Sequence, residues 1–205
     1  MATNATRPVR RTETRRRDEL VQAAFRLIAA RGFEGLRTRD VAESAGVNVA
    51  TLHYYFPTKE SLIRGVLDYA MARFRSTLAP DRSGEVQLRD HLRAVRKLLR
   101  DEPELGAVMA ELSLRSARDE SIAAIVGETY EAWHVTMRGL LRRAAKDGRL
   151  RAELATDGTA AMIIAVITSM TLPQVAGSQR TDLALKQLEA WLGLGGPADR
   201  RMSSN

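Results

Sequence analysis

Apolar residues recur at helical spacing along most of the chain. In the first 80 residues they predict three compact helices and a longer fourth helix. The predicted boundaries carry suitable residues, because glycine and proline end helices while hydroxyl and amide side chains cap their first turns. These boundary residues are Gly32, Thr38, Gly46, Asn48, Pro57, Thr58 and Pro80.

The stretch PDRSGE at residues 80–85 interrupts this pattern and predicts a loop between two modules. Beyond it no window alternates with the period of a strand, and helical spacing returns at 88–99, 105–117, 122–145, 156–176 and 183–194. Pro173 falls inside the fourth of these stretches. The sequence therefore predicts an all-α chain whose second helical module spans residues 81–195, followed by a loose tail at 196–205.

Residues 38–57 have the spacing of a helix-turn-helix. Ala42 lets two helices approach closely, Gly46 can adopt the left-handed backbone of the turn, and Leu52 fills the angle between the helices. Many unrelated proteins share this spacing, so it needs support from the residues around it.

A projection of residues 48–56 at about 100° per residue gives that support, because it separates a packing face from an outward face. The packing face holds Asn48, Val49, Leu52, Tyr55 and Phe56, and the outward face holds Ala50, Thr51, His53 and Tyr54. A small residue, a hydroxyl and two hydrogen-bonding rings suit the major groove of DNA, where base edges and thymine methyls are exposed. A merely solvated face would more often carry Glu, Lys or Gln.

Two helix starts repeat one pattern of hydroxyl, base and acid: Thr38-Arg39-Asp40 and Thr58-Lys59-Glu60. The acid complements the helix dipole but the base opposes it. A base at this position is useful if the helix start faces a DNA phosphate, which the free N–H groups and the cation would bind together. The alternative is a small penalty tolerated on an exposed surface.

The net charge of +7 is concentrated near the N-terminus. Residues 1–80 hold 14 Lys and Arg against 8 Asp and Glu, whereas the remainder holds 18 against 17. The excess comes largely from Arg7, Arg10, Arg11, Arg15, Arg16 and Arg17. We predict a flexible basic arm over residues 1–14 that meets a polyanion, with a solvated tail as the alternative.

Composition excludes several classes of site. The chain has no cysteine, so disulfides and thiolate chemistry are excluded, and no glycine-rich phosphate loop is present. His53, His91 and His134 are well separated and lack carboxylates at metal-ligand spacing. We therefore expect no metal, no cofactor and no catalytic residue. Without a signal peptide or a membrane-spanning run, we place the protein in the cytoplasm.

The run GFEGLRTRDVAESAGVNVATLHYYFPTKESLIRGVLDY, residues 32–69, resembles the N-terminal domain of the TetR family of bacterial transcriptional regulators. The resemblance covers roughly residues 15–75. It implies a homodimer with a helix-turn-helix DNA-binding domain (15–58, motif 38–57) and a connecting helix (59–80). A larger helical domain (81–195) would bind an effector and dimerise.

The family likeness also implies roles for single residues. Thr38 and Arg39 would contact the DNA backbone, and Lys59 a phosphate. The remaining expected DNA contacts, taken from the likeness, the outward face and the basic arm, are Asn48, Ala50, Thr51, His53, Tyr54, Tyr55, Arg16 and Arg17. Two residues depart from the family pattern: members more often carry Tyr at the position of His53, and many carry Lys or a polar residue at the position of Val49.

Large, flexible apolar side chains in the second module are candidates for an effector pocket, with Ser113 or His134 as a polar group. The set is Met109, Leu112, Ser113, Tyr130, Trp133, His134, Met137, Met162 and Val166. Each could equally be ordinary core. The effector would be small and mainly apolar.

The last two predicted helices are candidates for a dimer interface, because one is apolar nearly all round and the other has a broad apolar face. The expected contacts are Met162, Val166, Met170, Leu185, Leu188, Trp191 and Leu192. A dimer would present two recognition helices roughly 34 Å apart to a near-palindrome.

These observations favour a dimeric repressor that binds double-stranded DNA, leaves it when the effector binds and has no contact with a membrane. Two alternatives stay open. One is an all-helical enzyme or ligand carrier whose N-terminal helices only pack. The other is a non-specific DNA binder that depends on the arginine-rich arm.

Overall fold

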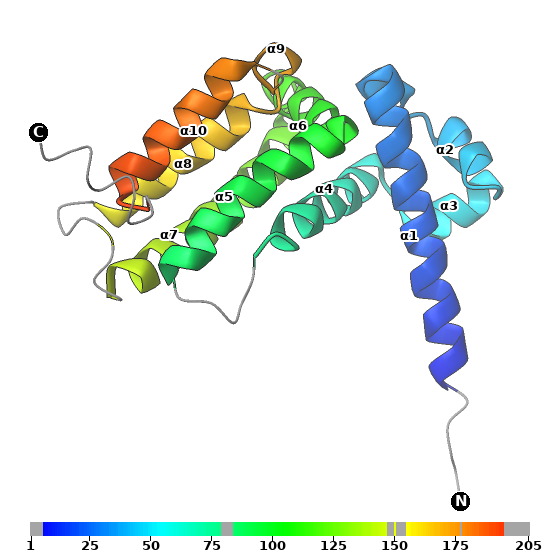
Figure 1. The fold of residues 1–205 in the computed structure, drawn as a ribbon. Helices are drawn as coiled ribbons and strands as arrows, with labels where there is room; N and C mark the ends of the chain where they lie inside the picture. The colour runs from blue at the N-terminus through cyan, green and yellow to red at the C-terminus, as the bar shows by residue number, and fades with distance from the viewer. Residues whose placement is uncertain (1–5, 79–83, 147–149, 151–154, 177, 195–205) are drawn as a thin grey trace, which may run out of the picture. The chain divides into compact units, whose positions relative to one another are not determined.

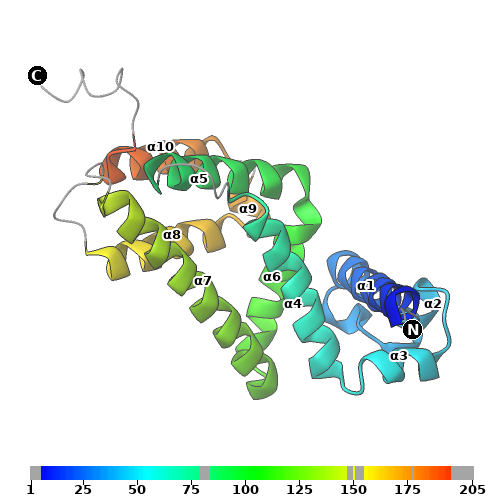
Figure 2. The same ribbon diagram turned by 90° about the horizontal axis from the view of Figure 1, so that it is seen from below.

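The structure is a computed structural model that describes residues 6–78, 84–146, 150, 155–176 and 178–194 (Figures 1 and 2). All regular elements in these residues are helices, which confirms the predicted all-α fold. In chain order they are α1 (Thr6–Arg31), η1 (Phe33–Gly35), α2 (Thr38–Ser44), α3 (Val49–Tyr55), α4 (Lys59–Arg75), α5 (Gly84–Asp101), α6 (Pro103–Ser116), α7 (Glu120–Lys146), α8 (Thr156–Ser169), α9 (Pro173–Ala176) and α10 (Gln179–Leu192).

The chain divides into two compact units that do not follow chain order. Unit 1 comprises residues 1–71 and 107–126, and unit 2 comprises residues 72–106 and 127–205. Three helices, α4, α6 and α7, begin in one unit and continue into the other. The predicted boundaries of 15–58, 59–80 and 81–195 follow the chain instead, and they stay a prediction.

The core of unit 1 is built from apolar side chains of its first four helices. Its largest fully buried members include Leu20, Ile28, Leu52, Phe56, Leu62 and Ile63. Between α1 and α2 the chain turns tightly. At Gly35 a Cβ atom would lie 2.8 Å from the carbonyl oxygen of Leu27, which is too close for any side chain.

Helix α1 starts earlier than the sequence suggested. The structure is helical from Thr6, so residues 6–14 of the expected flexible arm belong to α1. Further along α1, the carboxylate of Glu19 accepts hydrogen bonds from Arg15 at 3.0 Å and from Arg16 at 2.8 Å. Residues 1–5, the side chains of Arg7, Arg10 and Arg11, and the tail at 196–205 lie outside the described residues.

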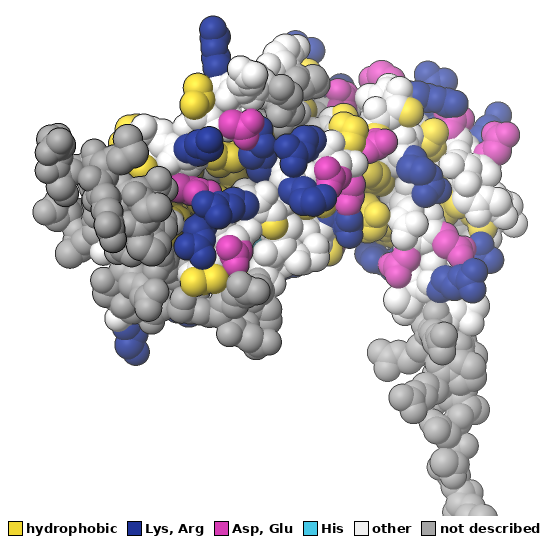
Figure 3. Space-filling model, in the orientation of Figure 1, with side chains coloured by type: hydrophobic (Ala, Val, Ile, Leu, Met, Phe, Trp, Pro, Cys, Tyr) yellow, Lys and Arg dark blue, Asp and Glu magenta, His cyan; other side chains and the backbone are white. Residues whose placement is uncertain are grey.

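In unit 2, α5 and α10 lie side by side in both views and are joined by ion pairs (Figures 1 and 2). Arg93 of α5 pairs with Glu189 of α10 at 2.7 Å, and Arg96 pairs with Asp182. On the face drawn in Figure 3, basic and acidic side chains accordingly mix over these helices instead of segregating by sign. On this face the charged side chains join α5 to α10 through ion pairs and do not form a basic patch.

The stretch 156–176, which has continuous helical spacing, is interrupted in the structure. Helix α8 ends at Ser169 and the short α9 begins at Pro173. Proline disfavours the helical conformation of the residue before it and has no amide hydrogen to donate, so the break precedes Pro173. Within the described residues, α8 and the other helices are too short or too polar to cross a membrane.

Candidate nucleic-acid interface

A Schellman turn connects α2 to α3. The amide of Val47 donates to the carbonyl of Ala42 at 2.9 Å, and the amide of Gly46 donates to Glu43 at 3.0 Å. Gly46 has φ 66°, the left-handed conformation predicted from the sequence. Ala42 and Leu52 are both 1% exposed, so the predicted small residue and wedge do occupy the angle between the helices.

Asn48 caps α3, as predicted. Its side-chain oxygen accepts hydrogen bonds from the Thr51 amide at 2.8 Å and from the Thr51 hydroxyl at 2.9 Å. Two of the expected DNA contacts are thus bonded to each other, which fixes the first turn of α3. The prediction that Thr38 caps α2 was wrong: α2 begins at Thr38 itself, and the capping position belongs to Arg37, which makes no side-chain cap.

The outward face of α3 is open to solvent. Tyr54 is 73% exposed, and His53 and Ala50 are also exposed, whereas Phe56 is 1% exposed. Tyr55 is half-buried and stands edge-on to Tyr54, with ring centroids 5.1 Å apart at 89°. Burial follows the projection made from the sequence except at Asn48, which is exposed although assigned to the packing face, and at Thr51, which is half-buried. The face formed by Ala50, His53 and Tyr54 is available to a partner.

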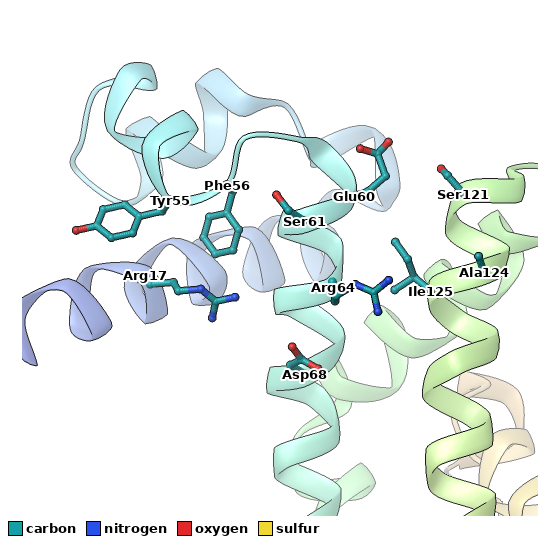
Figure 4. A pocket seen from close by; sticks show the side chains of 10 residues that line it. All are labelled: Arg17, Tyr55, Phe56, Glu60, Ser61, Arg64, Asp68, Ser121, Ala124 and Ile125. Carbon is teal, nitrogen blue, oxygen red and sulfur yellow. The ribbon is translucent and has the colours of Figure 1, made fainter. Parts of the chain in front are cut away.

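Arg17 of α1 lies against the end of α3. Its guanidinium is 4.9 Å from the ring centroid of Phe56 (Figure 4). Both residues line a pocket of about 450 Å³ within unit 1, and in Figure 4 the hydroxyl of Tyr55 points away from it. The charged residues that line the pocket are Arg17, Arg64, Glu60 and Asp68. The two positive and two negative side chains balance, so the pocket has no dominant charge.

Helix α4 begins with a reciprocal cap. The Thr58 hydroxyl accepts from the Ser61 amide at 3.1 Å, and the Ser61 hydroxyl accepts from the Thr58 amide at 3.3 Å, which confirms Thr58 as a capping residue. Arg39, at the second predicted phosphate site, is exposed. Its neighbour Asp40 lies 3.9 Å from Arg31.

Lys59 has an environment that the sequence did not indicate. Its ammonium lies 4.0 Å from the ring centroid of Phe33. Burial of this group lowers the pKa of Lys59 from its ordinary value, against the opposing effect of the Glu34 carboxylate. No sequence pattern signals a contact between residues so far apart, and Phe33 was not among the predicted site residues.

The predicted effector residues are divided between the two units. Met109, Leu112 and Ser113 belong to unit 1, and the other six belong to unit 2. Within unit 2, Trp133 is 5% exposed and stacks on Phe74 at 5.6 Å, with Tyr130 at 6.0 Å. His134 bonds to the backbone oxygen of Asp157 at 3.2 Å.

A second histidine of unit 2 was missed as a candidate. His91 is 1% exposed, and its Nδ1 lies 2.6 Å from the hydroxyl of Thr77, which in turn donates to the carbonyl of Phe74. Because the hydroxyl proton is used there, Nδ1 of His91 donates, and Nε2 is a buried acceptor without a partner among the described residues. Burial lowers the pKa of His91 to about 4, so the ring is neutral at pH 7.

The predicted dimer residues divide by burial. Leu185, Leu188, Leu192 and Met170 are at most 5% exposed within the protomer, so they pack in its own core. Met162 and Val166 are half-buried. On α10 the large apolar side chains left on the surface are Trp191, 52% exposed, and Leu183, 64% exposed, the latter absent from the predicted set.

Two family models match the chain. The model for bacterial regulatory proteins of the tetR family matches residues 20–66, which include the helix-turn-helix. The model for the C-terminal part of BetI-type transcriptional repressors matches residues 84–193, more than half of the chain.

Individual proteins agree with these models. The transcriptional repressor KstR2 of Mycolicibacterium smegmatis is 37% identical over 67 residues, 31% of this chain and 33% of KstR2. A TetR-family regulator from Rhodococcus sp. has a TM-score of 0.77 at 25% identity, covering 86% of this chain and 96% of that one. A regulator from Saccharomonospora viridis, solved in complex with choline, has a TM-score of 0.63 at 25% identity, covering 87% and 95%.

The match to KstR2 spans only a third of that protein's length. The family models extend it across both parts of the chain, and these relatives are regulators of transcription, not enzymes. The chain therefore belongs to the TetR family of bacterial transcriptional regulators, which bind DNA through a helix-turn-helix.

Proposed function

We propose that the protein is a homodimeric repressor that binds a near-palindromic operator in the cytoplasm and leaves it when a small ligand binds. Residues 15–58 read the DNA, residues 59–80 form the connection, and residues 81–195 bind the ligand and the second protomer. Ligand binding would favour a conformation with a different separation of the two α3 helices, which lowers the affinity for the operator.

The outward face of α3 carries this proposal. Tyr54 lies in the last turn of α3 and is 73% exposed, so its ring gains little stability from burial and is open to a partner. Its neighbours on that face, His53 and Ala50, are small or flat and can approach base edges and thymine methyls. Arg16 and Arg17 on α1 and the exposed Arg39 are suited to flanking phosphates.

Selection from random DNA tests the proposal. The full-length protein should enrich a near-palindrome whose half-sites lie about one helical turn apart, and footprinting should protect both halves. If selection enriches no sequence while binding falls steeply with salt, the protein is a non-specific binder instead.

The exposed apolar side of α10 is our candidate for the dimer interface. Trp191 and Leu183 are on the surface although large apolar residues gain by burial. Replacing Trp191→Glu should place a charge in the interface and give a monomer by sedimentation, with weaker operator binding. The matched change Glu128→Ala, at an exposed position of α7, should leave the dimer intact.

The aromatic cluster of Phe74, Trp133 and Tyr130 is our candidate wall for the ligand site, together with Met137. Rings suit a small, mainly apolar ligand, and they also attract quaternary ammonium cations such as the choline bound by the Saccharomonospora viridis protein. A thermal-shift screen of small molecules should identify the ligand, because a ligand at 100 times its Kd adds about 2.7 kcal/mol of stability. A hit must also release the operator, or it is not the effector.

A further inference from the structure

Phe33 is held by a residue 78 positions away in the sequence. Its amide N–H donates to the Oε1 atom of Glu111 on α6 at 2.8 Å, and both residues belong to unit 1. The amide opens η1, the short turn between α1 and α2, so it has no helical acceptor of its own. A carboxylate is a strong partner for such a donor.

The carboxylate fits because Gly32 leaves room for it. A Cβ atom on Gly32 would lie 3.3 Å from Oε1 of Glu111. Gly32 also has φ 68° and ψ −168°, a conformation that is essentially restricted to glycine. The end of α1 is therefore shaped so that α6 can reach the backbone of the turn.

Two cationic side chains pack on the ring of Phe33. The Phe33 ring is 5% exposed, and it lies under the ammonium of Lys59 at 4.0 Å and under the guanidinium of Arg115 at 4.8 Å. Arg115 stands one helical turn after Glu111, so both face the turn from α6. We call this cluster of Phe33, Lys59, Glu111 and Arg115 the Phe33 clamp.

The clamp lies next to the helices that would read DNA. The turn continues directly into α2 through a bond from the Leu36 amide to the Phe33 carbonyl at 3.1 Å. The Schellman turn at Gly46 then fixes α3 on α2. Whatever holds Phe33 therefore also constrains the direction of α3. Helix α6 begins at Pro103 in unit 2 and continues beyond Gly106 into unit 1, where Glu111 lies.

We propose that Glu111 is a positioning residue for operator binding: through the Phe33 amide it fixes the orientation in which α2 and α3 meet DNA. The proposal rests on the proposed function. Glu111 itself touches no DNA. Removing it should therefore lower affinity without removing a phosphate contact, even though the loss of an acid alone would favour binding to a polyanion.

Operator titrations with the full-length protein test this. Glu111→Ala should weaken binding about tenfold, and the salt dependence should keep the wild-type slope because no phosphate contact is lost. Glu111→Gln keeps an acceptor oxygen and should stay within about threefold of wild type. Glu104→Ala, which removes an exposed acid from the same helix, should not weaken binding. Unchanged affinity in Glu111→Ala, or a loss in Glu104→Ala of the same size, overturns the proposal.

Amide exchange gives a readout that needs no DNA. The chain has four phenylalanines, so ¹⁵N-phenylalanine labelling gives four amide signals, and Phe33→Leu identifies the relevant one. Exchange at Phe33 should be about tenfold or more faster in Glu111→Ala. If that variant does not fold, Glu111→Gln should show a smaller acceleration. Unchanged exchange overturns the clamp, whereas normal clamp behaviour in a protein without sequence preference would overturn only the proposed function.

Discussion

Two aromatic groups in the molecule have opposite surroundings. Tyr54 and Tyr55 meet edge to face on the outer side of α3, where Tyr54 is 73% exposed. Trp133 packs against both Phe74 and Tyr130 in unit 2 and is 5% exposed. An exposed ring beside a second ring leaves apolar surface that a partner can cover, whereas a buried cluster is compatible with a ligand wall and with plain core.

The largest expected effect is a loss of folding stability when the buried aromatic group is truncated. Trp133→Ala should lower the free energy of unfolding by about 3–5 kcal/mol, because it leaves a cavity in a packed core. Urea unfolding measures this loss. A loss below about 1 kcal/mol would contradict close packing of the Trp133 ring against its neighbours.

The next largest effect is the response of unit 2 to acid. Burial lowers the pKa of His91 from 6.5 to about 4, so between these values the unfolded chain binds a proton that the folded protein does not. Stability is therefore complete above about pH 6.5 and falls with decreasing pH by about 3 kcal/mol in total at pH 4. Unfolding curves of wild type and His91→Gln across this range should diverge, and parallel curves would contradict a buried neutral ring.

Tyr54→Ala should change recognition without changing stability. We expect a loss of about 1–3 kcal/mol in specific operator binding, with the unfolding free energy within about 0.5 kcal/mol of wild type. Leu114→Ala is the matched control, since Leu114 is an exposed apolar residue, 64% exposed, at the surface of α6. It should leave both quantities unchanged. Equal losses of operator affinity in both variants would refute a specific role for Tyr54.

The smallest effect concerns the basic flank of the interface. Arg17→Ala should weaken binding to all DNA sequences alike and reduce the salt slope by about one charge. Arg17 also stacks on Phe56, so Arg17→Lys, which keeps the charge but stacks less well, separates the two roles. A change in sequence preference in Arg17→Ala would assign it to base recognition.

Local rules predicted the DNA-binding helices well. The left-handed Gly46, the capping Asn48 and Thr58, and the buried Leu52 all follow from requirements that lie within a few residues of each other. Thr38 was the exception, because a hydroxyl next to a helix start can be the cap or the first helical residue, and the sequence does not distinguish them by one position.

Contacts between distant segments could not be predicted. Glu111 meets Phe33 across 78 residues, and nothing in the spacing of α6 indicates which backbone amide it would bind. For the same reason the apolar residues of α10 could be listed but not oriented: Leu185 and Leu188 pack inside the protomer while Trp191 does not. A broad apolar face can pack on its own chain and on a second copy, and only the tertiary structure separates the two.

The most direct test of DNA reading by α3 is a base-by-base comparison of wild type and Tyr54→Ala on the selected operator. Each base pair is replaced in turn and the change in Kd is measured at one salt concentration. We predict that Tyr54→Ala becomes indifferent to substitution at one or two symmetry-related positions and stays sensitive at the others. Equal sensitivity of both proteins at every position would contradict recognition through this face of α3.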